Sequence, residues 1–593
     1  MNRRRNSSSS QLSFAEVRVS WAKLLSESSR YRPVMILAIL FSMISAMLTL
    51  KAPDYLSEAT NVIMNGIMKG IDMDAVLAIF KKIALIYAIG LVLSLGQQLI
   101  MTTVTHRFSQ SLRSRIAEKI DLLPMSYYYK TSTGDVLSRV TNDVDTIGQS
   151  FNQSLGTFFS SITLFIGSLY MMVTTNVLMT LAAVLTSIVG FALMFVIMGH
   201  SQKYFFQQQE NLGALNGYIE EIFSGQTIVR AYNGEPEAKE TFRGLNEALR
   251  SSAYRSQRLG GLMPPLMMFI GNAGYVVVCV TGAVLTMQGK ATVGTIVAFM
   301  MYIRFFTQPL SQLGQVAQHM QSAAAAARRV FEFLEAEEMP DEMEKPSTLG
   351  TVSGNVSFDH VSFGYDPGKV IIHDFSADAM AGKKIAIVGP TGAGKTTLVN
   401  LLMRFYDPDG GEIRIDGTSS MDVKREAVRE QFCMVLQETW LFEGTIRENL
   451  TFSTPDVTDE MLDRACEAVG LDYFIRTLPK GYDTVLGDNV SLSQGQMQQL
   501  TIARAMIADR PMLILDEATS SVDTRTELII QRAMDELMKG RTSFVIAHRL
   551  STIRNADLIL VLRDGDIVES GTHEQLLAQN GFYAELYNSQ FEN

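Results

Sequence analysis

The sequence GPTGAGKTT, from Gly389 to Thr397, fits the pattern G-x-x-x-x-G-K-[ST] of a phosphate-binding loop. The short apolar run from Ile385 to Val388 precedes it, and the apolar segment from Leu398 to Phe405, which has no Gly or Pro, follows it. These flanks predict the order strand, loop, helix. A loop that ends at a helix N-terminus presents backbone N–H groups to an anion, so the sequence predicts a nucleoside triphosphate site.

Residues of this loop have distinct expected roles. Gly389, Gly392 and Gly394 would adopt positive φ angles, which let successive N–H groups point at phosphate oxygens. Lys395 can reach the β- and γ-phosphates, and the hydroxyl of Thr396 can coordinate Mg²⁺. The predicted nucleotide contacts in the loop are Gly389, Pro390, Thr391, Gly392, Ala393, Gly394, Lys395, Thr396 and Thr397.

The composition indicates more than one domain. The chain has 593 residues, of which 47% are hydrophobic and 19% are charged, and its net charge of −10 argues against a general nucleic-acid binder. The three cysteines lie too far apart for a zinc site, and their spacing suggests no disulfide framework. The basic, Ser-rich start MNRRRNSSSSQ has no apolar core before Phe14, so we expect it to be disordered and cytoplasmic rather than a cleaved signal. Residues 1–30 as a whole are predicted to form a cytoplasmic N-terminal tail.

Residues 31–335 predict a membrane domain of six helices, because a helix needs about 20 apolar residues to cross a hydrocarbon core of roughly 30 Å. The uncharged run of 57 residues after Asp145 is long enough for two spans with a turn near 174–177. Pro264 and Pro265 would bend the fifth span. The predicted spans are Val34–Leu50, Ile83–Thr105, the two spans of the uncharged run, Leu259–Gly289 and the segment from Ala291 onward.

Arg304 is the one charged residue well inside the sixth predicted span. An intramembrane charge usually faces a bundle interior or a water-filled cavity, so Arg304 is a candidate for the translocation pathway or for gating. The alternative is a side chain that snorkels to the inner interface. The many Met and Phe residues of these helices could line an adaptable apolar cavity, although packing and lipid-facing roles are the default for each of them.

The distribution of Lys and Arg predicts the orientation of the spans. The N-terminal tail up to Arg32 holds seven, residues 106–145 hold six and residues 203–258 hold seven, whereas residues 51–82 on the other side hold four. The N-terminus is therefore expected in the cytoplasm and, after six spans, so is the C-terminal half.

Helical patterns in the two long cytoplasmic connections predict that spans two to five extend beyond the bilayer. The patterns cover Ile116–Leu123 and Asn216–Arg230. The turns at Tyr127–Asp135 and Arg230–Glu237 would then contact the C-terminal domain, with solvated loops as the alternative. An acidic, Pro-containing linker over residues 336–354 precedes that domain.

Residues 355–593 alternate short β-rich runs with helical stretches, which predicts an α/β domain. One predicted strand ends in Asp516 and Glu517, and another ends in His548. Ligands of open α/β sheets bind at the carboxyl ends of strands, so these side chains should lie beside the phosphate loop. Asp516 would hold Mg²⁺, Glu517 would polarise a water for attack on the γ-phosphate, and His548 would position that water or contact the phosphate.

The sequence LSQGQ at residues 492–496 opens a predicted helix. Ser493 and Gln496 have the spacing of a capping box, which by itself predicts only a well-capped helix. A helix N-terminus with an exposed Ser and Gly can also bind an anion such as a γ-phosphate. The two roles are compatible.

Six segments in this order resemble the nucleotide-binding domain of ATP-binding-cassette (ABC) transporters: VSFGYDPG with Tyr365, GPTGAGKTT, VLQETWLF with Gln437, LSQGQ, LILDEATSSVD and IAHRLST. With six spans on the same chain, the sequence resembles a half-size ABC exporter of the type IV (type I exporter) fold. The implied fold class is a membrane α-helical six-span domain with long cytoplasmic helix extensions, followed by an α/β P-loop ABC ATPase domain. The implied cofactors are ATP and Mg²⁺.

The resemblance implies roles that spacing alone does not explain. Tyr365 would stack on adenine, Gln437 would sense Mg²⁺ and the attacking water while contacting the membrane domain, and Asp523 would lie in the loop that links two ATP sites. Two ATPase domains pair head to tail in this family, so Ser493 and Gly495 would cover the ATP held by a partner's loop. The implied nucleotide contacts outside the loop are Tyr365, Ser493, Gly495, Gln496 and Asp523. The implied catalytic residues are Glu517, His548 and Gln437, and the implied metal ligands are Thr396, Gln437 and Asp516.

Departures from the usual family motifs resemble the catalytically intact subunit of bacterial heterodimeric multidrug exporters. The signature is LSQGQ instead of LSGGQ, Met497-Gln498-Gln499 stands where a basic residue is common, and GDNVS precedes the signature. These features favour a heterodimer over a homodimer as the working unit. Because Glu517 and His548 are both present, the chain's own loop is expected in the hydrolysing site.

The resemblance implies ATP-driven export of amphipathic or hydrophobic compounds, of the multidrug type, across the cytoplasmic membrane. The expected partners are a second half-transporter subunit, membrane lipids and a small hydrophobic substrate, and no nucleic acid is expected. A homodimeric lipid flippase or lipid exporter is the main alternative, and an ATP-gated channel or sensor is a further one. The sequence does not identify the transported substrate.

Overall fold

The computed structural model of the chain describes residues 13–67, 70–366, 368–436, 439–487, 492–516, 524–546 and 553–591. The chain divides into two compact units. The first unit contains Met1–Asp121 and Thr133–Ala336, and the second contains Leu122–Ser132 and Glu337–Asn593. The short segment Leu122–Ser132 therefore belongs with the C-terminal half, although it lies in the N-terminal half of the sequence.

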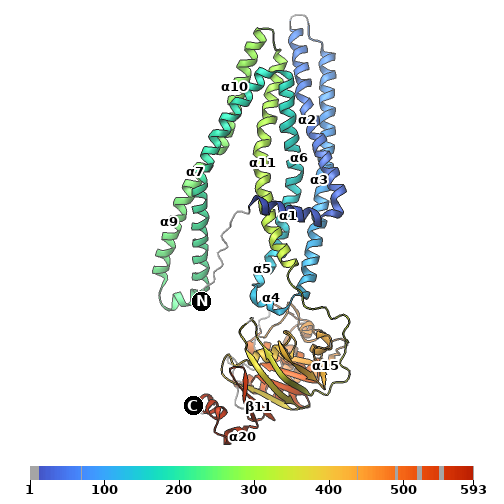
Figure 1. Cartoon of the computed structure of the whole chain (residues 1–593), viewed down its shortest axis with the longest axis vertical. Helices are drawn as coiled ribbons and strands as arrows, with labels where there is room; N and C mark the ends of the chain where they lie inside the picture. Colours follow the sequence, from blue (N-terminus) through green and yellow to red (C-terminus); the bar gives the residue numbers. More distant parts are fainter. Residues whose placement is uncertain are drawn as a thin grey trace. The chain divides into compact units, whose positions relative to one another are not determined.

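The first unit is α-helical (Figure 1). Six of its helical segments are long and apolar enough to cross a membrane, which confirms the predicted six spans. Its long helices are α2 (Arg32–Gly66), α3 (Met73–Leu122), α6 (Val144–Thr175), α7 (Val177–Ser224), α9 (Glu235–Gly260), α10 (Met263–Met287) and α11 (Val293–Leu334). Its short helices are α1 (Phe14–Glu27), η1 (Ser29–Tyr31), α5 (Thr133–Ser138), η2 (Arg139–Asp143) and α8 (Gln226–Ala231).

The breaks between the long helices follow the sequence signals. Asn176 separates α6 from α7 and caps α7 by accepting a hydrogen bond from the Met179 N–H, inside the predicted turn. The expected bend at Pro264 and Pro265 is instead a break, because α9 ends at Gly260 and the two prolines lie in the first turn of α10. Helix α3 has 50 residues, or about 75 Å, which far exceeds a hydrocarbon core of roughly 30 Å.

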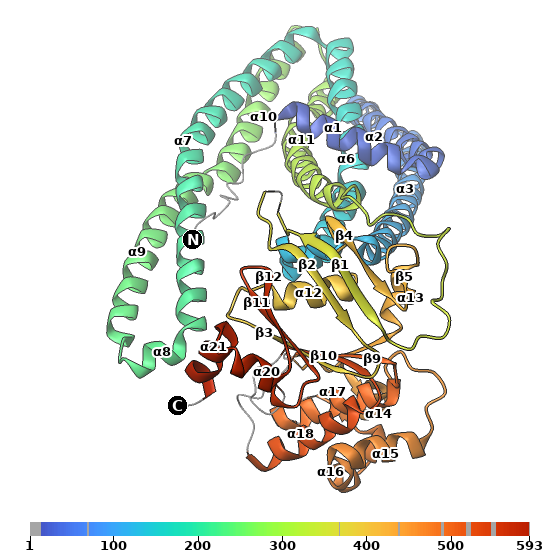
Figure 2. The ribbon, with the colours of Figure 1, turned by 60° about the horizontal axis from the view of Figure 1, so that its bottom comes forward.

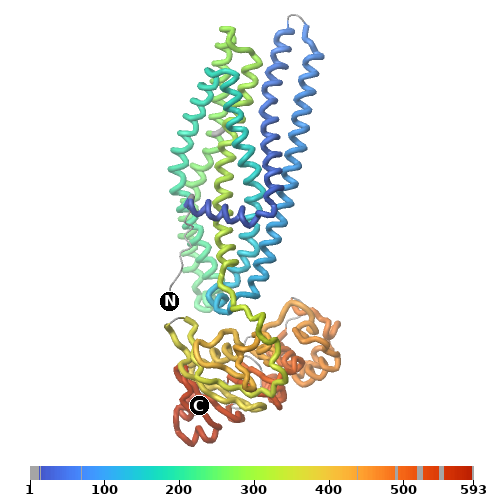
Figure 3. Tube along the Cα trace, turned by 45° about the vertical axis from the view of Figure 1, so that its right-hand side comes forward, coloured from blue at the N-terminus to red at the C-terminus, as the bar shows by residue number. Residues whose placement is uncertain are grey.

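Helix α1 shows that the predicted N-terminal tail contains an ordered element. Its N-terminus has a capping box in which Ser13 and Glu16 exchange hydrogen bonds. Trp21 is 5% exposed, stacks on Phe151 of α6 with a centroid distance of 5.2 Å, and donates from Nε1 to the Met320 carbonyl of α11 at 3.0 Å. Figures 1 and 3 show α1 lying across the long helices of this unit. The expectation of disorder applied to the Ser-rich start, which lies outside the described residues.

The second unit contains two main sheets. A six-stranded sheet has the order β12-β11-β3-β10-β9-β6, and all its neighbouring strands are parallel except β11 and β12. An antiparallel sheet has the order β2-β1-β4-β5, and a small pair joins β7 to β8. The strands are β1 (Val356–Phe363), β2 (Ile372–Ala379), β3 (Lys384–Val388), β4 (Gly410–Ile415), β5 (Thr418–Ser419), β6 (Phe432–Val435), β7 (Gly444–Thr445), β8 (Val485–Leu486), β9 (Met512–Asp516), β10 (Thr542–Ile546), β11 (Leu558–Arg563) and β12 (Asp566–Gly571).

Helices surround these sheets in two groups. Helix α12 packs in a buried cluster with β1, β2 and β3, while α15, α17 and α18 pack in another with β6 and β9. In Figure 2, α15 to α18 lie together, away from α12. The helices are α4 (Met125–Lys130), α12 (Lys395–Leu402), α13 (Arg425–Arg429), α14 (Ile446–Leu450), α15 (Asp459–Val469), α16 (Asp472–Thr477), η3 (Gly481–Asp483), α17 (Gln494–Ala508), α18 (Thr524–Met538), α20 (His573–Ala578) and α21 (Phe582–Phe591).

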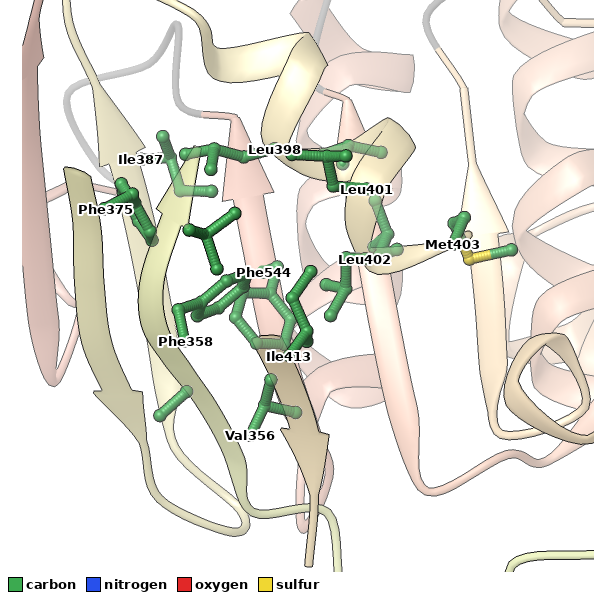
Figure 4. Close-up of a cluster of buried hydrophobic side chains, with 14 of the residues drawn as sticks. Val356, Phe358, Phe375, Ile387, Leu398, Leu401, Leu402, Met403, Ile413 and Phe544 are labelled. Atoms are coloured by element: carbon green, nitrogen blue, oxygen red, sulfur yellow. The ribbon is translucent and has the colours of Figure 1, made fainter. Parts of the chain in front are cut away.

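The core between the two sheets fixes the position of α12. Phe358 of β1 lies edge-on to Phe375 of β2 and to Phe544 of β10, with centroid distances of 5.0 and 6.4 Å. Leu398 and Leu401 of α12 belong to the same buried cluster, as Figure 4 shows. Burying these side chains removes their apolar surface from water and holds α12 at the end of β3.

The expected linker is anchored to the second unit by ion pairs. Glu342 accepts hydrogen bonds from the Arg404 guanidinium and, at 2.8 Å, from the backbone N–H of Arg425. Arg404 is 1% exposed and also donates to the Val423 carbonyl at 2.7 Å. A buried guanidinium without its carboxylate would be costly, so this part of the chain is structurally required.

Candidate functional site

The predicted phosphate loop lies between β3 and α12, in the expected order of strand, loop and helix. Gly392 and Gly394 have φ angles of 87° and 101°, which L-residues with side chains rarely adopt. A Cβ at Gly392 would meet no atom within 4 Å, so the space in front of this backbone is open. The loop therefore presents its N–H groups and the start of α12 to an open space that an anion can enter.

Gly389 differs from the sequence-based expectation, because its φ is not positive. Its requirement is close packing. A Cβ at this position would lie 2.4 Å from the carbonyl oxygen of Leu562 on β11 and 3.1 Å from the Cβ of Ala393. The first glycine of the loop is therefore needed for the approach of β11 to the end of β3.

Lys395 begins α12 and is half-buried. Its Nζ donates to the carbonyl oxygens of Gly389 and Pro390 at 2.7 and 3.1 Å. Burial lowers the pKa of Lys395, and the negative charge of Asp516 opposes that shift. The ammonium group thus lies within the loop, where it can exchange two carbonyl partners for phosphate oxygens.

A cluster of tyrosines forms a cavity of about 420 Å³ beside α12. The rings of Tyr365 and Tyr406 lie edge-on at 5.0 Å, and Tyr365 also receives a hydrogen bond on its Oη from Asn400 at 3.0 Å. Tyr365 Oη in turn donates to Thr397 Oγ1 at 3.3 Å, so the Thr397 hydroxyl faces the tyrosine in this structure rather than open space. Thr396, in contrast, is exposed and lines the cavity.

The segment 122–132 adds three residues to this cavity that the sequence did not assign to the site: Ser126, Tyr129 and Lys130. The Tyr129 ring lies 6.3 Å from the Tyr406 ring, and Lys130 pairs with Asp366 at 3.4 Å. Burial, Tyr365 and Tyr129 raise the pKa of Tyr406 to about 12, so its hydroxyl is neutral at physiological pH.

The predicted contact of Tyr127–Asp135 with the C-terminal domain is observed for its first residues, because the segment up to Ser132 belongs to the second unit. No sequence motif marks Tyr406, since an aromatic residue after a helix usually belongs to the core.

The strand ends bring Asp516 to the edge of the sheet that carries the loop. Asp516 of β9 pairs in register with Ile546 of β10, and Ile546 pairs with Ile387 of β3, one residue before the strand ends. The predicted placement of Asp516 on this edge is thus observed, and its charge acts on Lys395. The remaining predicted catalytic and linking residues lie outside the described residues: Gln437, Glu517, Asp523 and His548.

The signature sequence begins α17, as predicted. Ser493 Oγ accepts from the Gln496 N–H at 3.2 Å, and Gln496 Oε1 accepts from the Ser493 N–H at 2.9 Å, which confirms the capping box. Ser493 is exposed and Gly495 is buried. Gln499, in the stretch that lacks the usual basic residue, donates to the Val469 carbonyl at 2.7 Å and so holds the end of α15.

The loop on β3 and α12, the strand edge with Asp516 and the capped helix α17 define an ATPase domain of the ABC class, joined to six membrane helices. Comparison with known families agrees. Residues 35–310 match the ABC transporter transmembrane region, and residues 372–520 match the ABC transporter domain. The chain belongs to the ABC transporters and is a half-size exporter, in which one membrane domain and one ATPase domain share a polypeptide.

Individual relatives match most of the chain. The fatty acid ABC transporter ATP-binding/permease protein of Mycobacterium bovis is 43% identical over 520 residues, covering 87% of this chain and 82% of the relative. The ATP-dependent lipid A-core flippase of Syntrophus aciditrophicus is 36% identical over 516 residues, covering 86% and 85%. The structure of a bacterial Atm1-family ABC exporter with ATP bound has a TM-score of 0.73 at 28% identity, covering 94% of this chain and 98% of that one. The protein is therefore a multi-pass membrane protein with an ATP-binding domain whose ATPase activity is coupled to transport.

Proposed function

We propose that this chain is one subunit of a dimeric exporter that uses ATP hydrolysis to move amphipathic or hydrophobic compounds outward across the cytoplasmic membrane. The observation that carries this proposal is the union of six membrane helices and an ABC ATPase domain in one polypeptide. ATP would favour one conformation of the dimer, and hydrolysis would restore the other. The N-terminus and the ATPase domain would lie in the cytoplasm, as the Lys and Arg distribution indicates.

The separation of the phosphate loop from the signature helix supports a dimer. The loop follows β3, whereas α17 packs on β6, the edge strand of the same sheet. The Ser493 hydrogen bonds in the described part of the chain stay within the capping box and do not reach the loop. Ser493 and Gly495 would therefore act on the ATP of a second subunit.

Two exposed apolar surfaces also support a partner subunit. The α7–α8–α9 tip exposes Phe223, Ile228 and Tyr232 by 82%, 63% and 81%. In the ATPase domain, Trp440 and Phe452 border a groove of about 220 Å³ beside α17. Exposed apolar patches commonly mark interaction sites. The tip of one subunit would contact this groove in the other.

For the nucleotide, Tyr365 and Tyr406 would hold adenine, and Lys395 would contact the phosphates. Thr396 and Asp516 would bind Mg²⁺, because a hydroxyl and a carboxylate are oxygen ligands that suit this ion. The described residues contain no group of three His, Cys, Asp or Glu that could hold a metal without the nucleotide. Bound together with ATP, the ion would neutralise phosphate charge.

A heterodimer is the preferred assembly, because the departures in the signature stretch resemble the intact subunit of such exporters. A homodimeric lipid exporter is the second candidate. It is favoured by the two relatives, which are named for a fatty acid and for lipid A-core. Purifying the chain alone and together with the product of the neighbouring gene, followed by size and ATPase measurements, separates the two. A fully active self-dimer would exclude the heterodimer.

The transport cycle is tested with Glu517→Gln in the purified complex. We expect ATP to bind with near-normal affinity, while hydrolysis and ATP-dependent efflux of a hydrophobic dye from vesicles are lost. Asp564→Asn is the matched control, since that carboxylate is 94% exposed in the turn between β11 and β12. Near-normal ATPase activity in Glu517→Gln would remove Glu517 from its proposed role, and ATP-gated ion conductance without efflux would replace the exporter with a channel.

A further inference from the structure

A large cavity lies within the membrane unit, between α7, α10 and α11. Its volume is about 980 Å³, at the upper end of the range for small-molecule sites. Aromatic and methionine side chains form much of its wall, among them Phe191, Met194, Met198, Phe205 and Met263. Methionine side chains adapt to irregular apolar shapes, so this wall suits a flexible hydrocarbon chain.

Arg304 is the one charged side chain among the described residues that line this cavity. It is exposed to the cavity space, and it makes no hydrogen bond or ion pair with any other described residue. The sequence left open whether Arg304 serves the pathway or snorkels to the interface. The cavity favours the first role.

The position of Arg304 makes an uncompensated charge costly. From Val293, where α11 begins, to Arg304 the helix rises about 16 Å, which is roughly half the thickness of a hydrocarbon core. A charged side chain at such depth is unfavourable unless water or an opposite charge accompanies it. An anionic ligand in the cavity would supply that opposite charge.

Uncharged polar residues lie on the same face of α11 as Arg304. Thr307, Gln308 and Ser311 follow it by three, four and seven residues, and all three line the cavity. Gln308 and Ser311 can donate hydrogen bonds to oxygens that the guanidinium does not reach, whereas the Thr307 hydroxyl donates to the Ile303 carbonyl at 2.9 Å. The polar face of α11 is therefore opposed by a largely apolar wall from α7 and α10, to which α7 also contributes the polar residues Ser201 and Gln202.

We propose that this cavity binds a single-tailed amphiphile with an anionic head group, a carboxylate or a phosphate, whose charge pairs with Arg304. The tail lies against the methionine and phenylalanine wall. A guanidinium forms paired hydrogen bonds with either head group, so the two share one recognition chemistry. That the bound amphiphile is exported rests on the proposed function. Its binding to the cavity does not depend on that function and is measured without ATP.

The test uses the full-length complex in nanodiscs of neutral phosphatidylcholine and measures saturable binding of radiolabelled palmitate. Hexadecyl phosphate, hexadecanol and hexadecyltrimethylammonium serve as competitors of equal tail length and different charge. We expect Arg304→Gln to weaken palmitate binding about ten-fold or more, as for loss of a charge-assisted hydrogen bond, and Arg304→Lys to weaken it much less. Arg243→Gln, on the exposed face of α9 and paired with Glu240, is the matched control with unchanged binding.

Binding of palmitate to Arg304→Gln with wild-type affinity would overturn the assignment. So would equal competition by hexadecyltrimethylammonium and hexadecyl phosphate. Dissociation of the Arg304→Gln complex into subunits, with palmitate affinity retained, would show that Arg304 pairs with the partner instead. Saturable binding of radiolabelled hexadecyl phosphate that is weakened in Arg304→Gln, with no binding of palmitate, would identify a phosphate head group and support the assignment. Selective binding together with no ATP-dependent transport of any hydrophobic compound would refute the proposed export function and leave this assignment intact.

Discussion

Gly389→Ala tests how the phosphate loop is held in place. The added Cβ would lie 2.4 Å from the carbonyl oxygen of Leu562, so the loop or β11 must move by at least about 0.6 Å to reach a separation of 3.0 Å. Because β3 and β11 are paired up to Val388 and Val561, that movement strains the ladder. Overpacking of this kind costs about 1–3 kcal/mol.

The consequence for ATP follows from the geometry of the loop. Its N–H donors are aligned for phosphate oxygens, and each charge-assisted hydrogen bond contributes about 1.5–3 kcal/mol, so one lost bond weakens binding about ten-fold or more. Titration with a fluorescent ATP analogue and a thermal melt of the full-length complex measure both effects. Gly217→Ala on α7, where a Cβ would meet nothing within 4 Å, is the control; it should leave the ATP affinity unchanged and should not lower the melting temperature, because alanine favours a helix more than glycine does. Gly389→Ala with wild-type affinity and melting temperature would refute the packing explanation.

Three further changes address other parts of the molecule. Tyr129→Ala should weaken binding of the ATP analogue about three- to ten-fold, because the Tyr129 ring packs on Tyr406. Tyr129→Phe keeps the ring and should keep the affinity. Equal affinities of Tyr129→Ala and the wild type would show that Tyr129 is not part of the site. Glu342→Gln should lower the melting temperature of the ATPase domain by removing about 1.5–3 kcal/mol, since buried Arg404 loses one of its two carboxylate partners and keeps Asp407 at 3.0 Å. Burial raises the pKa of Glu342, but hydrogen bonds from Arg425 and Lys345 and the charge of Arg404 outweigh burial and hold this pKa below its ordinary 4.5. The stability that the Glu342 carboxylate adds is therefore present above pH 4.5 and is lost as the pH falls through the lower pKa of the folded state. A difference in melting temperature between wild type and Glu342→Gln that does not depend on pH would contradict this. Trp21→Ala should destabilise the membrane domain by about 3–5 kcal/mol in a melt monitored by fluorescence of a site-specific label, and an unchanged melt would show that α1 does not stabilise the bundle.

Local patterns were sufficient for much of the fold. Uncharged runs set the six spans because the bilayer imposes a minimum length, and Asn176 marks a helix break by its capping chemistry. The order of strand, loop and helix around Lys395 follows from the apolar flanks. The capping box at Ser493 follows from spacing alone, because both of its hydrogen bonds are local.

Contacts between distant parts of the sequence were not predictable in the same way. The role of Gly389 depends on the approach of β11, which follows it by about 170 residues, so only the assembled sheet shows why glycine is needed there. Tyr129 joins Tyr406 from a separate part of the chain. Helix α1 was not predicted from the sequence, because the contacts that hold it are made with distant residues. Its Trp21 stacks on Phe151 of α6 and donates a hydrogen bond to the Met320 carbonyl of α11.

The connectivity of the two units has a mechanical consequence. The backbone passes between them three times, after Asp121, after Ser132 and after Ala336. A body attached at one point can swivel about that point, whereas attachment at several separated points removes most of those rotational freedoms. The segment Leu122–Ser132, which also borders the tyrosine cavity, is therefore joined to the first unit through the backbone at both of its ends.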